Sequence, residues 1–306
     1  MLTSLILLQS LIVIVLQYIA VTAVKDLKER RMRMNFHNDE WIMEKTWEHL
    51  AEATDDFHAD HIVGIFVQGS QNYGLDYEDS DIDTKLIVTP TLKEIAENTS
   101  PISRTHIRKN DEHIDYKDIR LYVETFRKHN PNFLEVLFTQ YFVVSEYYKP
   151  EWDILVENRE KIARSNEFRA IKAMVGVASQ KFHALKHEYP SRMEWINRFG
   201  YDPKQLHHLF RIEEFMSRFI AGVPYEECMY SLNPEYLVKV KMGCHSLEEA
   251  EFLARRSMSR IEEMAKDFLK NKEDKMDPEV DELLKEIQYK IIEKSIRLEL
   301  KREEER

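Results

Sequence analysis

The segment of residues 69–85, with the sequence GSQNYGLDYEDSDIDTK, constrains the fold of this chain more than any other. It follows an apolar, β-branched run at residues 61–68, which predicts a buried strand that ends at Gly69. It leads into a second apolar run at residues 85–88, which predicts another strand. We therefore expect a sheet in which two strands each carry polar side chains at one end.

The polar residues of this segment are of the types that bind phosphate and metal ions. Gly69 has no Cβ, so a phosphate can come close to backbone N–H groups there, and Ser70 adds a hydroxyl. Alternation along a strand places Asp81 and Asp83 on one face, with their backbones roughly 7 Å apart. Two carboxylates on one face suit Mg²⁺ or Mn²⁺, whose remaining ligands are water and phosphate oxygens. An isolated Asp-x-Asp pair also fits a solvated strand end, but its combination with Gly69-Ser70 favours a metal–nucleotide site.

Three segments resemble one known family. Gly69-Ser70, Tyr73-Gly74 and Ser80-Asp81-x-Asp83 together resemble the signature of the DNA polymerase beta-like nucleotidyltransferase superfamily, in particular its bacterial and phage RNA-repair-pathway branch. Residues 130–135 and 200–211 are similar to two further segments of that branch. The resemblance implies an enzyme that transfers NMP from an NTP to a hydroxyl group and releases pyrophosphate. It also implies that Gly69, Ser70 and Tyr73 bind the nucleotide.

The resemblance further implies a third carboxylate on a neighbouring strand. Asp115 lies between two apolar residues of a predicted strand at residues 112–117, which leaves it on the polar face. Asp118 directly precedes a helical stripe of apolar residues and is expected to cap that helix. We predict that Asp115 is the third carboxylate. In the superfamily such a trio, here with Asp81 and Asp83, holds two metal ions, and the third carboxylate helps to deprotonate the attacking hydroxyl.

Composition sets the remaining bounds. A chain of 306 residues that is 43% hydrophobic and has only 7 glycines is expected to be globular and rich in helix, with room for two domains. Its two cysteines form neither a ligand pattern nor a disulfide framework, which fits the reducing cytoplasm. A net charge of −11 opposes broad attraction to nucleic acid, although a local basic groove is compatible with it.

The first 24 residues carry no charge and are dominated by Leu, Ile and Val. As a helix they would extend roughly 35 Å, enough to cross a bilayer. The basic residues 25–33 would then keep the body of the protein in the cytoplasm, and the absence of a preceding basic region opposes a secretory signal. Residues 1–24 are therefore interpreted as a membrane anchor, as part of a misassigned start with translation beginning at Met34, or as a buried core helix.

Beyond the leader, the patterns predict an α+β fold. We expect a small mixed sheet of the nucleotidyltransferase type flanked by helices, followed by an all-helical domain. A helix is predicted at residues 39–57, and strands at 63–68, 85–88 and 112–117. From about residue 158 only helical patterns occur, at residues 167–188, 203–219, 246–270 and 278–306. The catalytic domain is assigned to residues 35–157 and the helical domain to residues 158–306, with the substrate between them.

The helical part contains a candidate cationic face. Asp202-Pro203 is a typical helix start, and Lys204, His208 and Arg211 then share one face of that helix. Facing a triphosphate, these side chains would neutralise charge as pyrophosphate leaves, and Arg211 would be an exposed cation. A solvated helix face is the alternative. Lys181, on another predicted helix, is a further candidate cation.

The sequence therefore predicts a Mg²⁺-dependent nucleotidyltransferase that uses an NTP and a hydroxyl acceptor on RNA, a protein or a small molecule. One alternative is transfer of AMP to a protein side chain. The other is a regulatory protein that binds nucleotide without catalysis. The presence of three candidate carboxylates together with Gly69 and Ser70 opposes this second alternative.

Overall fold

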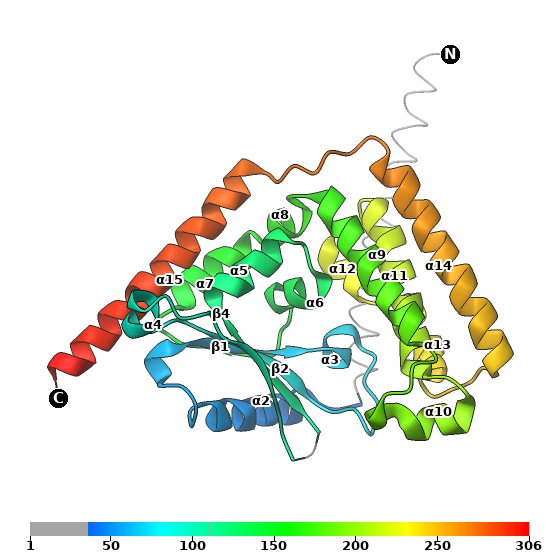
Figure 1. The fold of residues 1–306 in the computed structure, drawn as a ribbon, viewed down its shortest axis with the longest axis horizontal. Coiled ribbons are helices and arrows are strands. Elements are labelled where there is room, and N and C mark those ends of the chain that lie inside the picture. Colours follow the sequence, from blue (N-terminus) through cyan, green and yellow to red (C-terminus); the bar gives the residue numbers. More distant parts are fainter. Residues whose placement is uncertain (1–35, 110, 306) are drawn as a thin grey trace, which may run out of the picture.

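The structure is a computed structural model that describes residues 36–109 and 111–305 (Figure 1). The anchor expected at residues 1–24, and the alternative start at Met34, lie outside these described residues. Within the described ranges, no helix is both long enough and apolar enough to cross a membrane.

A five-stranded mixed sheet forms the first part of the described chain. In spatial order its strands are β3 (Ser103–Ile107), β4 (His113–Asp118), β2 (Asp83–Val88), β1 (Ile62–Gln68) and β5 (Phe142–Val144). β2 and β4 are parallel, and the other neighbouring pairs are antiparallel. Gln68 lies opposite Asp83, and Lys85 lies opposite Asp115. The polar ends of three adjacent strands therefore meet at one place on the sheet.

Helices cover both faces of the sheet. Leu86 packs with Ala53 of α2 (Asp39–Ala53) on one face, whereas its neighbour Ile87 packs into the main core on the other. That core includes the apolar side of α5 (Ile119–Arg127), whose buried residues recur with helical spacing. Figure 1 shows α2 on one side of the sheet and α5 on the other. Short elements complete this part: η1 (Ala59–His61), α3 (Ser70–Tyr73), α4 (Leu92–Ala96), α6 (Pro131–Leu134) and η2 (Glu135–Leu137).

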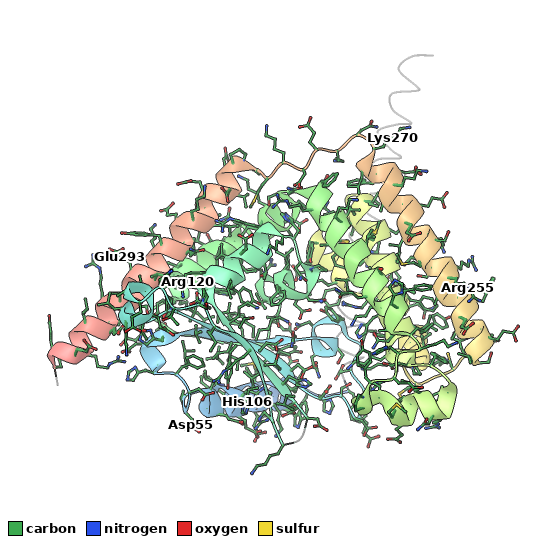
Figure 2. The ribbon with its side chains drawn as sticks, viewed as in Figure 1. Asp55, His106, Arg120, Arg255, Lys270 and Glu293 are labelled. Atoms are coloured by element: carbon green, nitrogen blue, oxygen red, sulfur yellow. The ribbon has the colours of Figure 1, made fainter. Side chains whose placement is uncertain are left out.

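Beyond β5, the described chain is helical. Its elements are α7 (Lys149–Glu157), α8 (Arg159–Arg164), α9 (Glu167–Ala184), η3 (Pro190–Arg192), α10 (Met193–Phe199), α11 (Pro203–Ile220), α12 (Tyr225–Met229), α13 (Pro234–Lys241), α14 (Leu247–Leu269) and α15 (Pro278–Glu304). α9, α11 and α14 pack on one another, and α13 packs on α11. Figure 2 shows Arg255 of α14 and Glu293 of α15 pointing outward, as expected of the polar faces of amphipathic helices.

The last helix returns to the sheet. α15 packs mainly against α7, α5 and η1 rather than against the α9–α11–α14 group, and Figure 1 shows it on the opposite side of the molecule from α14. Its Ser295 is fully buried and lies 2.5 Å from the hydroxyl of Thr89 and 3.0 Å from Nδ1 of His61. The last helix is thus packed against the sheet part of the described chain.

The predicted α+β class is confirmed, and no strand occurs among the described residues after β5. Two strands were not predicted. β3 is polar and largely exposed at the sheet edge, and β5 has only three residues, so neither has an apolar alternation. The first helix ends at Ala53, four residues before the predicted end.

Candidate functional site

A cavity of about 400 Å³ lies between the sheet and the helical part, a size typical of small-molecule sites. One wall comes from β1, α3, β2, β4 and η2, and the other from α9, α11 and α13. The residues that the sequence singled out all line it: Gly69, Ser70, Tyr73, Asp81, Asp83, Asp115, Lys181, Lys204, His208 and Arg211.

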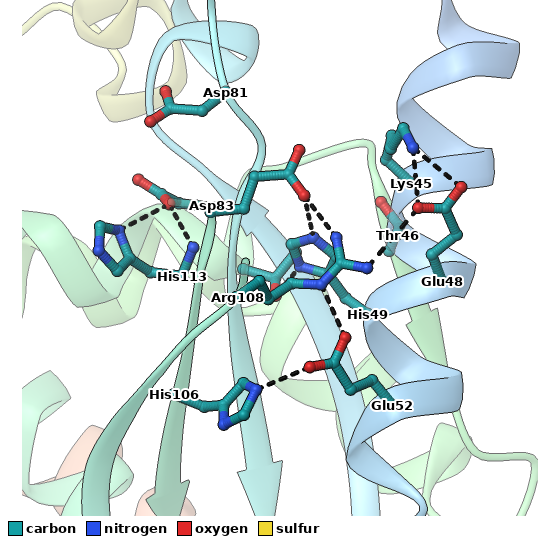
Figure 3. Close-up of polar contacts among 12 residues, drawn as sticks. Lys45, Thr46, Glu48, His49, Glu52, Asp81, Asp83, His106, Arg108 and His113 are labelled. Carbon is teal, nitrogen blue, oxygen red and sulfur yellow. Dashed lines mark hydrogen bonds and ion pairs between the residues drawn. The ribbon is translucent and has the colours of Figure 1, made fainter. Parts of the chain in front are cut away.

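The carboxylates belong to the sheet wall. Asp83 is the first residue of β2, and Asp81 lies two residues earlier on the same face, because Ile82 between them is fully buried. Figure 3 shows the two side chains along one segment of the chain. Burial, followed by the charge of Asp81, raises the pKa of Asp83, and the backbone N–H of His113 opposes this shift. Two carboxylates that repel each other in this way would bind a cation with relief of that repulsion.

Asp115 of β4 is contacted by side chains from β3 and from β1. The hydroxyl of Thr105 donates a 2.6 Å hydrogen bond to its Oδ1, and Nε2 of Gln68 lies 3.5 Å from its Oδ2. Asp118 has a different role, since its carboxylate accepts the backbone N–H of Arg120 at the start of α5 and pairs with the Arg120 side chain at 2.6 Å. The predicted helix cap is thereby confirmed, and Asp115 is the residue that faces the cavity.

The Gly69 turn is fixed by buried hydrogen bonds. Gly69 has φ 95° and ψ −144°, a region that residues with a Cβ rarely adopt. Nδ2 of Asn72 donates to the carbonyl of Val67 at 2.8 Å, and Nε2 of Gln71 donates to the carbonyl of Asp81 at 2.7 Å. The second bond ties the turn directly to the carboxylate segment.

Cations form the opposite wall. Lys181 comes from α9, Lys204 and Arg211 from α11, and Lys241 from α13. Burial lowers the pKa of Lys181, and the charges of Lys204 and Arg211 add to the shift. Burial also lowers the pKa of Lys241 to about 8. These positive groups repel one another and therefore favour an anionic ligand.

Arg211 is not the exposed cation that its helical position suggested. Its guanidinium carbon lies 3.8 Å from the ring centroid of Tyr73, and its Nε is buried without a hydrogen-bond partner. Burial lowers the pKa of Arg211, whereas the carboxylate of Glu135 raises it. The prediction of an exposed side chain was wrong because α11 is covered on this side by the sheet wall.

His208 does not contribute a positive charge to the cationic face. Burial, with repulsion from His207 and from Lys181, holds the pKa of His208 well below its usual range. His207 is likewise neutral, because burial lowers its pKa to about 3. The helical spacing of His208 with Lys204 and Arg211 was correct, but a helical spacing carries no information about burial.

Three charged residues of the cavity were not predicted to bind ligand. Lys85 is almost fully buried, with Nζ 3.8 Å from Oε1 of Glu135, and burial lowers its pKa to about 8. Burial also raises the pKa of Glu135 to about 8. Lys85 follows Asp83 by two residues, and this spacing could have indicated the shared face. Lys241 comes from a distant helix, and no local pattern marks it.

The carboxylate donors fit a divalent cation that is shared with a phosphate ligand. Within the described part of the chain, no three His, Cys, Asp or Glu side chains already form a complete metal cluster. Asp81 and Asp83 alone match the one or two carboxylates by which Mg²⁺ is commonly held when phosphate oxygens supply further ligands. Burial, and after it the charge of Asp81, raises the pKa of Asp83, and a cation bound here would oppose that shift.

Comparison with known proteins adds little. No protein-family model matches the sequence, and no curated protein matches it significantly. A solved structure of a nucleotidyltransferase-like protein from Exiguobacterium sibiricum is similar over 74% of this chain and 75% of that one, with 12% identity and a TM-score of 0.27. At that identity and TM-score, the likeness supports no inference about activity. A function is therefore inferred from the chemistry of the cavity alone.

Proposed function

We propose that this protein is a metal-dependent nucleotidyltransferase that transfers NMP from an NTP to a hydroxyl group and releases pyrophosphate. The observation that carries the proposal is the arrangement of charge in one cavity. Asp81, Asp83 and Asp115 line the sheet wall, and Lys181, Lys204, Arg211 and Lys241 line the helical wall. A triphosphate with a divalent cation is complementary to both walls at once.

Arg211 supports an anionic ligand most directly. Its Nε is desolvated without an acceptor, which costs free energy that a phosphate oxygen would recover. Lys204 and Lys241 lie on the same wall as Arg211 and would stabilise the charge that develops on the departing pyrophosphate. The backbone N–H groups around Gly69, together with the Ser70 hydroxyl, would hold phosphate oxygens from the sheet side.

Asp81 and Asp83 would hold the Mg²⁺ or Mn²⁺ ion, which when bound aligns phosphates and screens their charge. The acceptor oxygen attacks the α-phosphorus while the bond to the β-phosphate oxygen breaks, and pyrophosphate leaves with that electron pair. Asp115 takes the proton of the attacking hydroxyl. Its Oδ1 is already bonded to Thr105, which leaves Oδ2, only weakly bonded to Gln68 at 3.5 Å, for this step.

The test uses the purified protein with each α-phosphate-labelled NTP, Mg²⁺ or Mn²⁺, and either RNA, protein from a lysate or its small-molecule fraction. Label should appear on one acceptor class. Asp83→Asn should reduce transfer by orders of magnitude, because a neutral amide is a poor ligand for a hard cation.

Asp118→Asn is the matched control. It makes the same chemical change one strand away and outside the cavity, and Asn also caps helices well, so transfer should persist. Wild-type transfer by Asp83→Asn would contradict the proposal. NTP binding without transfer to any acceptor would favour a non-catalytic regulatory protein, and label on protein alone would identify AMP transfer to a side chain.

A further inference from the structure

His113 donates twice to the same oxygen of Asp83. Its backbone N–H lies 2.9 Å, and its ring Nδ1 3.1 Å, from Oδ1 of Asp83 (Figure 3). Asp83 as a cation ligand is ionised and can only accept hydrogen bonds, so Nδ1 of His113 then carries the proton. Within the described ranges no hydrogen bond reaches Oδ2 of Asp83, which leaves this oxygen available to the cavity.

A second contact joins the same two strands from the opposite face. His49 of α2 is fully buried, with Nδ1 2.9 Å from the hydroxyl of Thr84 and Nε2 3.0 Å from Oε2 of Glu112. Thr84 directly follows Asp83, and Glu112 directly precedes His113. Because successive residues point to opposite faces, the two contacts connect β2 and the start of β4 from both sides at one level.

Arg108 anchors the hairpin that carries His113. Its guanidinium donates to Oε2 of Glu112 at 2.5 Å and to Oε2 of Glu52 at 2.8 Å. Oε1 of Glu52 lies 2.7 Å from Nε2 of His106 on the same hairpin. Figure 3 shows Glu52, His106 and Arg108 between α2 and the β3–β4 hairpin. The hairpin is therefore fixed to α2 by charge-assisted bonds on the side away from the cavity.

We infer that His113 is a positioning residue that orients the carboxylate of Asp83, and that the clamp of His49 with Thr84 and Glu112 holds His113 in place. The inference rests on the proposed function only in taking Asp83 as a cation ligand. With Oδ1 engaged by His113, Asp83 presents Oδ2 to the cavity and would hold a cation through that oxygen. Hydrogen bonds that fix a metal ligand in this way raise the affinity of the site.

The first experiment measures Mn²⁺ binding to the full chain by electron paramagnetic resonance, without nucleotide. His113→Leu removes the ring donor and should weaken Mn²⁺ affinity by about 10-fold or more. His113→Asn keeps a donor where Nδ1 lies and should retain most of the affinity. His183→Leu, at an exposed position of α9, serves as control and should bind as wild type. Unchanged affinity in His113→Leu, or equal losses in both His113 variants, would overturn the inference.

The second experiment tests the clamp. Thr84→Val removes only the hydroxyl that contacts His49 and keeps the shape of the side chain. It should weaken Mn²⁺ binding. In the double variant with His113→Leu, the loss of binding free energy should be smaller than the sum of the two single losses, because both changes act on the placement of Asp83. Wild-type affinity in Thr84→Val, or strictly additive losses, would contradict a role of the clamp beyond folding.

The two claims can fail separately. Mn²⁺ binding that depends on His113 in a protein that transfers no nucleotide would contradict the proposed function and support this inference. Nucleotide transfer that proceeds in His113→Leu with unchanged Mn²⁺ affinity would do the reverse.

Discussion

At the residue scale, Arg211 combines a stability cost with a proposed binding role. Its buried Nε lowers the stability of the free protein, since this atom has lost its hydration without a hydrogen bond in return. Stacking on Tyr73 at 3.8 Å offsets part of this cost. Residues of this kind persist where a ligand completes their bonding, so their removal should separate stability from binding.

Arg211→Met is expected to leave the free energy of unfolding unchanged or to increase it, because Met fills a similar volume without a charge. The same change should raise the NTP Michaelis constant roughly 10- to 150-fold, as loss of a charged hydrogen bond is worth about 1.5–3 kcal/mol. Urea denaturation and steady-state kinetics measure the two effects. Lys172→Met, at an exposed position of α9, should change neither. Unfolding of Arg211→Met with normal kinetics would show that Arg211 is structural.

Lys241 should make the proposed activity decline at alkaline pH. Its pKa is about 8, so it is protonated below that pH and loses its charge as the pH rises through it. The kcat/KM for NTP, which reports the free enzyme, should therefore decline above about pH 8. Lys241→Arg keeps its charge and should show a weaker decline, while any contribution of Lys85 remains. Identical pH profiles for wild type and Lys241→Arg would exclude Lys241 from phosphate binding.

Residues of the cavity were predictable from the sequence where the chemistry is local. Gly69, Ser70, Asp81 and Asp83 fall within one short segment, and strand alternation alone places the two aspartates together. The protonation state of His208 and the roles of Lys85 and Lys241 were not predictable. They depend on burial and on contacts between distant segments, to which neither spacing nor composition is sensitive.

At the element scale, the turn between β1 and α3 depends on backbone conformation rather than on space. A Cβ built on Gly69 would have no atom within 4 Å, yet its φ of 95° disfavours any other residue. The packing around Gly69 would therefore tolerate a side chain, but its backbone conformation would not.

Gly69→Ala should destabilise the protein by about 1–3 kcal/mol or shift the turn, with loss of NTP affinity in either case. Gly176→Ala is the matched control, because Gly176 also has free space around it but lies within α9. There the same change should stabilise the protein by about 0.5–1 kcal/mol. Denaturant titration compares the two variants. Equal effects of both substitutions would rule out backbone strain at Gly69.

The two strands that were not predicted, β3 and β5, lie at the two edges of the sheet. β3 lies at the sheet edge with mostly exposed side chains, so no apolar alternation marks it, and it is specified by pairing with β4. By contrast, α11 and α15 begin at Asp-Pro sequences whose aspartates cap them, and such starts were readable. Periodicity showed that α15 is a helix, but it could not show that α15 packs beside α5 and α7.

At the scale of the whole molecule, buried neutral histidines link distant parts. His129 follows α5, and its Nε2 accepts the backbone N–H of Asn166, the cap residue of α9, at 3.0 Å. Burial lowers the pKa of His129 to about 4 and that of His207 to about 3, and burial also lowers the pKa of His61 and His208. All four are thus held in the uncharged form by the fold.

As the pH is lowered, the protein should begin to lose stability at a higher pH than carboxylate titration alone predicts. Below pH 6.5 these histidines bind protons in the unfolded chain but stay neutral in the folded protein. The free energy of unfolding therefore falls as the pH decreases from 6.5 towards 4. Glu135, with its pKa raised to about 8, and Asp83, whose pKa is also raised, act in the opposite direction, but they are two groups against four. Urea titrations at several pH values between 7.5 and 4.5 measure the slope. A constant free energy of unfolding over this range would contradict the expectation.

The two walls of the cavity have opposite charges, and binding of the two proposed ligands is therefore expected to be coupled. A divalent cation on Asp81 and Asp83 removes the negative charge that would repel a triphosphate, and the triphosphate returns oxygens that complete the shell of the cation. Each ligand therefore increases the affinity of the other, and the factor is the same in both directions. Either ligand alone would meet one favourable wall and one unfavourable wall, so the protein would bind the pair as if it were a single substrate.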